Sequence, residues 1–136
     1  MRKRKSKQIH KPLFFYNEFF RSNFWISRNI PFEDFKKSVL KYMGVDLKNK
    51  VGTSGCVYEF DHQNGSKVLW MWLGSDSIVD LAHECMHAVF MDLEYKGVKY
   101  SVDSEETYCY YLSILMDIIL KETKWGIYGN QTRNES

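Results

Sequence analysis

Two histidines and a glutamate form the most informative pattern in this sequence, His83-Glu84-Cys85-Met86-His87, in which the histidines are four residues apart. On an α-helix, positions four apart differ by about 40° around the axis and by one turn along it. Two imidazoles in this arrangement can bind one metal ion, and zinc accepts histidine nitrogen while keeping a position open for water. Glu84 is then close enough to take a proton from that water as a general base. The pattern predicts that His83 and His87 bind a zinc ion and that this zinc site carries out hydrolysis.

The residues around this motif predict a helix over 78–93. Apolar side chains recur along it at helical spacing, at Val79, Ala82, Met86, Val89 and Leu93. Residues 74–77, Gly-Ser-Asp-Ser, are typical of helix N-termini, and Gly97 suits the end of a helix. Helical geometry therefore applies to the two histidines.

A catalytic zinc ion usually has three protein ligands, so a third is expected elsewhere in the chain. No histidine follows His87, which favours a carboxylate on the next predicted helix, 103–121. We predict Glu106 as the third zinc ligand because it begins the more polar line of that helix, formed by Glu106, Tyr110, Ser113 and Asp117. Glu105 is the alternative ligand. Asp103 and Glu106 also have the spacing of a capping box, which explains Glu106 without a metal.

These residues give the chain a resemblance to gluzincin-type zincins, in which a glutamate on a second helix follows the H-E-x-x-H helix. The chain is more similar to small phage-encoded proteins of the zinc metallopeptidase type, in which H-E-x-x-H-A precedes a glycine-containing turn and an E-x-x-x-Y helix. The resemblance extends over residues 50–120 and depends on His83, Glu84, His87, Glu106 and Tyr110. It implies a minimal zincin-like domain of the α+β class that binds Zn²⁺. In that fold a small antiparallel or mixed sheet packs on the motif helix and on the glutamate-bearing helix.

The expected function is that of a zinc-dependent hydrolase, a metallopeptidase that cleaves peptide or amide bonds of a peptide or protein substrate. Glu84 is the predicted general base, and Tyr110 is a candidate to hydrogen-bond the developing oxyanion or to orient a ligand. A packed tyrosine explains Tyr110 equally well. The alternative function is that of a non-catalytic, zinc-containing protein of zincin fold that binds a host or phage protein, which the small size of the chain favours.

Length and composition predict one domain, over residues 13–128 of the 136. We expect a basic, disordered tail at 1–12 and a loose tail at 129–136. Three cysteines without paired spacing indicate a reducing compartment, the cytoplasm, or the host cytoplasm for a phage protein. No apolar run has the length of a membrane span, so no membrane partner is expected. The basic tail suits phosphate contacts, but no aromatic residue lies among its charges, so nucleic acid is not the expected partner.

The rest of the chain predicts the elements that position the motif. The expected elements are one or two strands within 13–28, a helix over 31–44, and strands at 55–60 and 67–73. The last two strands should form a hairpin, because Asn64-Gly65 between them is a strong turn signal. The segment 68–73 is apolar on both faces, which favours a packed strand, while a role as the peptide-binding edge of the cleft is left open.

Overall fold

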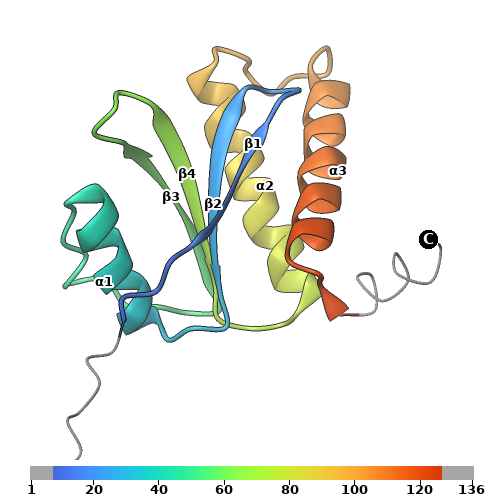
Figure 1. The fold of residues 1–136 in the computed structure, drawn as a ribbon. Helices are drawn as coiled ribbons and strands as arrows, with labels where there is room; N and C mark the ends of the chain where they lie inside the picture. Colours follow the sequence, from blue (N-terminus) through green and yellow to red (C-terminus); the bar gives the residue numbers. More distant parts are fainter. Residues whose placement is uncertain (1–7, 127–136) are drawn as a thin grey trace, which may run out of the picture.

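The structure, a computed structural model, describes residues 8–126. Within this range the chain forms four strands and three helices, in the order β1 (Leu13–Asn17), β2 (Ser22–Arg28), α1 (Phe32–Met43), β3 (Gly55–Asp61), β4 (Lys67–Leu73), α2 (Ile78–Tyr95) and α3 (Glu105–Glu122). Figure 1 shows the sheet between α1 on one side and the α2–α3 pair on the other. The predicted α+β class is confirmed, and of the two expected kinds of sheet, antiparallel or mixed, the structure has the mixed one. The predicted tail 129–136 and the first seven residues of the predicted tail 1–12 lie outside the described residues.

The strands form one sheet in the order β1-β2-β4-β3. The β1–β2 and β3–β4 pairs are antiparallel, whereas β2 and β4 are parallel. The predicted hairpin is therefore present, with Gly55 opposite Leu73 and Asp61 opposite Lys67. Because β4 lies between β2 and β3, it cannot be the edge of a cleft, and the packed alternative is confirmed. Among the described strands, the edge nearest α2 belongs to β3.

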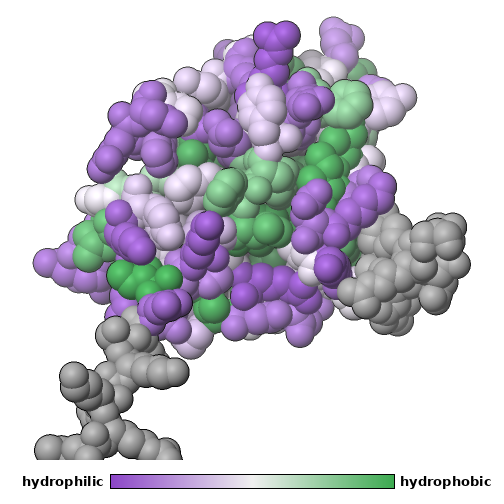
Figure 2. Space-filling model, viewed as in Figure 1, coloured by the Kyte–Doolittle hydropathy of each residue, from purple (hydrophilic) through white to green (hydrophobic). Residues whose placement is uncertain are grey.

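The two faces of the sheet bury two separate apolar clusters. On one face, Val68, Trp70 and Trp72 of β4 pack with Phe35 and Val39 of α1. On the other face, Leu69, Met71 and Leu73 of β4 pack against the buried sides of α2 and α3. A strand buried on both faces must be apolar throughout, which explains its sequence. On the surface seen in Figure 2, apolar side chains gather over β1 and α3 and are framed by polar ones.

Local signals in the sequence set the helix ends. α1 stops at Gly44, which has a φ of 69°, the left-handed conformation that glycine adopts without steric cost. α2 begins at Ile78 as predicted, and the side chain of Ser77 accepts a hydrogen bond from the backbone N–H of Asp80. α2 continues to Tyr95, two residues beyond the predicted end.

α3 begins after Ser104, so Asp103 precedes the helix and the predicted capping box does not form. The buried side of α3 consists of Tyr108, Tyr111, Leu115, Ile119 and Leu120. Among the described residues, no helix has the length and apolar character needed to cross a bilayer.

Candidate metal centre

The imidazoles of His83 and His87 converge on the surface of α2. Their Nε2 atoms are 3.1 Å apart, and their rings are nearly perpendicular, at 74°. Two nitrogens bound to one tetrahedral zinc ion at about 2.0–2.1 Å would be separated by about 3.3 Å. The donor set and its spacing therefore fit a shared zinc ion. Both residues are exposed, so such an ion would remain open to solvent and to a substrate.

Glu84 lies on the inner side of the two histidines and is only 6% exposed. Its Oε1 atom is 4.0 Å from Nε2 of His83. Burial raises the pKa of this carboxyl above its ordinary value, while the neighbouring His87 and His83 oppose the change. A largely buried carboxyl group therefore lies beside the histidine nitrogens.

The edge strand β3 holds Glu84 in this position from the opposite side. A Cβ atom added to Gly55, the first residue of β3, would lie 2.9 Å from Cγ of Glu84 and 3.1 Å from the carbonyl oxygen of Trp72. Only glycine leaves room for this approach of the strand to the helix. The position of the Glu84 carboxylate thus depends on a residue nearly thirty positions earlier in the chain.

A cavity of about 330 Å³ opens between β3 and α2 at this point. It is lined by Thr53, Gly55, Cys56, Val57, His83, Glu84, His87 and Met91. The outer edge of β3 is paired with no other described strand, and Gly55, Cys56 and Val57 of this strand line the cavity. Histidine nitrogens, a buried carboxylate and an unpaired strand edge therefore border one space.

Glu106, the predicted third ligand, does not lie with the histidines in this structure. It is exposed, and it lies about 160° around α3 from Tyr108, which is on the buried side of the helix. Glu105 is exposed as well. Among the described residues, no three His, Cys, Asp or Glu side chains form a group that could hold a metal ion.

The length of α2 explains why the predicted ligand set does not assemble. The helix runs eight residues beyond His87, which is about 12 Å of helix, before the chain turns back into α3. The first turn of α3 therefore lies beside the far end of α2, where the Tyr108 hydroxyl donates a hydrogen bond to the carbonyl oxygen of Val98. The line that begins at Glu106 is polar because it faces solvent: Tyr110 on the same line is 60% exposed.

Comparison with protein-family models, with curated proteins and with solved structures finds no match. The interpretation of this site therefore depends on the chemistry and geometry of its own residues.

Five residues that line this cavity were not predicted as site residues from the sequence: Thr53, Gly55, Cys56, Val57 and Met91. Met91 had a local signal, because it follows His87 by one helical turn and so extends the same face of the helix. Gly55 and Val57 had none, because their place beside α2 is set by the order of strands in the sheet.

Proposed function

We propose that this protein is a zinc-dependent hydrolase in which His83 and His87 bind the metal ion and Glu84 is the general base. The observation that carries this proposal is the 3.1 Å separation of the two Nε2 atoms, with the buried carboxylate of Glu84 4.0 Å from one of them. A chance pair of histidines on a helix surface would not require a buried glutamate between them. The substrate class that we propose is a peptide or amide.

The chemistry divides between the ion and the chain. A bound zinc ion supplies Lewis acidity, which lowers the pKa of a bound water and polarises a carbonyl group. The neutral imidazoles of His83 and His87 supply the ligand nitrogens. Glu84 accepts a proton from the attacking water and delivers it to the leaving nitrogen. Its raised pKa suits both steps, because a group that must bind and then release a proton works best with a pKa nearer the working pH.

The edge of β3 supports a peptide as the substrate. An extended peptide can pair with an unpaired strand edge through backbone hydrogen bonds, with alternate side chains directed into neighbouring pockets. Here Gly55 lies beside Glu84, and Val57, two residues along the same face of β3, lines the cavity together with Met91. A peptide paired with β3 would lie beside the cavity that the two histidines line.

A second function has its own support, that of a non-catalytic zinc protein. Within residues 8–126 no third metal-binding side chain accompanies His83 and His87. A ligand from a protein partner could complete the coordination of an ion that is exposed in this way. The protein would then bind a partner through the metal and would not turn over a substrate.

A combined metal and cleavage assay separates the two functions. Protein purified without an affinity metal would be analysed for zinc by mass spectrometry and incubated with a broad peptide library. If the protein is a hydrolase, the native chain should contain about one zinc ion and should cleave a peptide. Glu84→Gln should keep the zinc but lose the cleavage. Zinc without cleavage of any peptide would favour the binding protein, and continued cleavage by Glu84→Gln would refute the role of this residue.

A further inference from the structure

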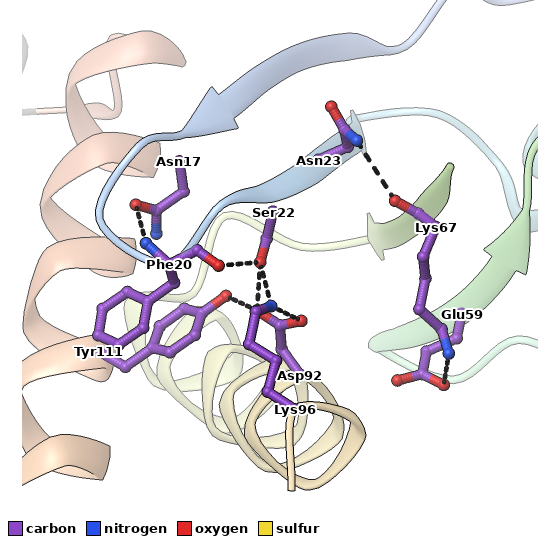
Figure 3. Close-up of polar contacts among 9 residues, drawn as sticks. All are labelled: Asn17, Phe20, Ser22, Asn23, Glu59, Lys67, Asp92, Lys96 and Tyr111. Atoms are coloured by element: carbon purple, nitrogen blue, oxygen red, sulfur yellow. Dashed lines mark hydrogen bonds and ion pairs between the residues drawn. The ribbon is translucent and has the colours of Figure 1, made fainter. Parts of the chain in front are cut away.

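We propose that a second cavity, at the C-terminal end of α2, binds an anionic group, either a carboxylate or a phosphate. The cavity has a volume of about 310 Å³, and its lining includes Arg21, Lys67 and Lys96, with Asp92 as its one carboxylate. It adjoins the start of β2, the start of β4 and the last turn of α2 (Figure 3). This proposal does not depend on the proposed hydrolase function.

The single carboxylate of the lining is already satisfied by the protein. Asp92 is 3% exposed and accepts hydrogen bonds from the hydroxyls of Ser22 and Tyr111, and Lys96 Nζ lies 2.5 Å from its Oδ1. Figure 3 shows these donors gathered around the Asp92 carboxylate. The charge of Asp92 is therefore offset by Lys96, which also lies at the negative end of the α2 dipole. Lys67 is paired with Glu59, so the charge that no described carboxylate offsets is that of Arg21, while Lys67 still presents N–H donors at the cavity.

Lys67 is held in place at the cavity by two contacts. Its Nζ atom lies 3.5 Å from the ring centroid of Tyr95 and 3.3 Å from Oε2 of Glu59. The aromatic face stabilises the ammonium without using any of its N–H donors in a conventional hydrogen bond. Because the ammonium has three donors and Glu59 takes one, donors remain for an anion. A fixed ammonium with open donors is suited to binding an oxyanion.

The conformation and surroundings of Arg21 also indicate a ligand. Its φ is 53°, a left-handed conformation that glycine or asparagine adopts at lower cost than arginine. The turn between β1 and β2 therefore does not need an arginine, and the side chain, which is exposed beside the cavity, requires another explanation. Among the described residues, Arg21 forms no ion pair. Its guanidinium can donate two parallel hydrogen bonds to a carboxylate or a phosphate.

The site is separate from the histidine pair but lies on the same helix. Met91 lines the histidine cavity, and Tyr95, one turn later, lines this one. The helical distance from His87 to Tyr95 is about 12 Å. Substitutions in the histidine cavity and substitutions in this second cavity can therefore test the two sites independently.

The test is an NMR titration of the full chain at constant ionic strength, in which the amide chemical shifts are recorded at each ligand concentration. One arm uses sodium phosphate and the other uses sodium succinate. We expect saturable shifts at Arg21, Lys67 and Lys96, and the anion that binds more tightly identifies the source of the oxyanion. Arg21→Gly, which suits the left-handed backbone, and Lys67→Gln should each weaken binding at least fivefold. Lys99→Gln removes the same charge from an exposed residue outside the cavity and should change the affinity less than twofold.

Three results would overturn the proposal. The first is the absence of saturable shifts with either anion. The second is a loss of affinity in Lys99→Gln equal to that in Arg21→Gly, because the effect would then be one of overall charge. The third is a loss in His87→Ala, because the anion would then occupy the histidine site.

Discussion

Gly55 on β3 and Glu84 on α2 approach each other so closely that a single Cβ atom at position 55 would lie 2.9 Å from Cγ of the glutamate. This contact joins the edge strand to the proton acceptor of the proposed site. Gly55→Ala should therefore displace Glu84 from the histidines without removing any proposed ligand. We expect kcat/KM to fall about 10- to 100-fold, the effect of misplacing a catalytic group by about 1 Å, with zinc content unchanged.

The control for this variant is Asp61→Ala, at the exposed far end of the same strand, which should retain the activity of the native protein. Kinetics and metal analysis on both variants check the prediction. Full activity in Gly55→Ala would show that Glu84 does not need its present position.

Metal binding should depend on the two histidines and not on the acidic residues of α3. His83→Ala and His87→Ala each remove one of two nitrogens that are 3.1 Å apart, so each should lose bound zinc. Glu106→Ala and Glu105→Ala alter exposed side chains and should change the zinc affinity less than twofold. Competition with a chromogenic chelator measures all four. A large loss of affinity in Glu106→Ala would restore the ligand set that the sequence predicts.

The hydroxyl of Tyr111 should stabilise the fold, because it donates a hydrogen bond to the buried carboxylate of Asp92. Tyr111→Phe leaves that carboxylate with one donor fewer and should lower the free energy of unfolding by about 1–3 kcal/mol. Tyr110→Phe is the matched control on the exposed side of α3 and should change it by less than about 0.5 kcal/mol. Urea denaturation measures both variants. Equal effects of the two substitutions would contradict the role of the Asp92 network.

Alkaline pH should destabilise the protein through the same tyrosine. Burial and the hydrogen bond to Asp92 raise the pKa of Tyr111 above its ordinary value near 10. A group whose pKa is raised by folding contributes its full stability below the unfolded pKa and loses it as the pH rises toward the folded pKa. Stability should therefore fall above about pH 10, and it should fall less steeply in Tyr111→Phe. Denaturation curves between pH 8 and pH 11 would show this difference, and parallel curves would contradict it.

The three cysteines should differ in their reactivity. Burial, with the nearby charge of Glu84, raises the pKa of the Cys56 and Cys85 thiols to about 12. Both should remain protonated and slow to alkylate at pH 8, since the thiolate is the reactive form. Cys109 is exposed and should react with iodoacetamide first. Mass spectrometry of the native and the urea-unfolded protein measures the order. Rapid alkylation of Cys85 in the native protein would contradict its buried position.

Local patterns were sufficient to predict much of this fold. The helix that carries the two histidines, its start at Ile78 and the hairpin around Asn64-Gly65 all depend on residues close in sequence. The convergence of His83 and His87 follows from the same local geometry, because four residues make about one helical turn. These features do not require knowledge of distant contacts.

The remaining features depend on contacts between distant segments. The order β1-β2-β4-β3 makes β3 the edge strand beside α2 and encloses β4, and no pattern within either strand specifies that order. The same limitation applies to Glu106. A polar line on an otherwise apolar helix has the same composition whether it faces a metal site or solvent, and here it faces solvent. Gly55 could be assigned a role only once the strand was placed against Glu84.

An anomalous difference map recorded at the zinc absorption edge, from crystals of protein purified without chelator or affinity metal, tests the metal centre most directly. Our account predicts a single peak about 2.0–2.1 Å from Nε2 of both His83 and His87. It also predicts that the Glu84 carboxylate lies beside the bound water and does not ligate the ion. A map without a peak at these nitrogens, or with the peak on another group of residues, would contradict the account.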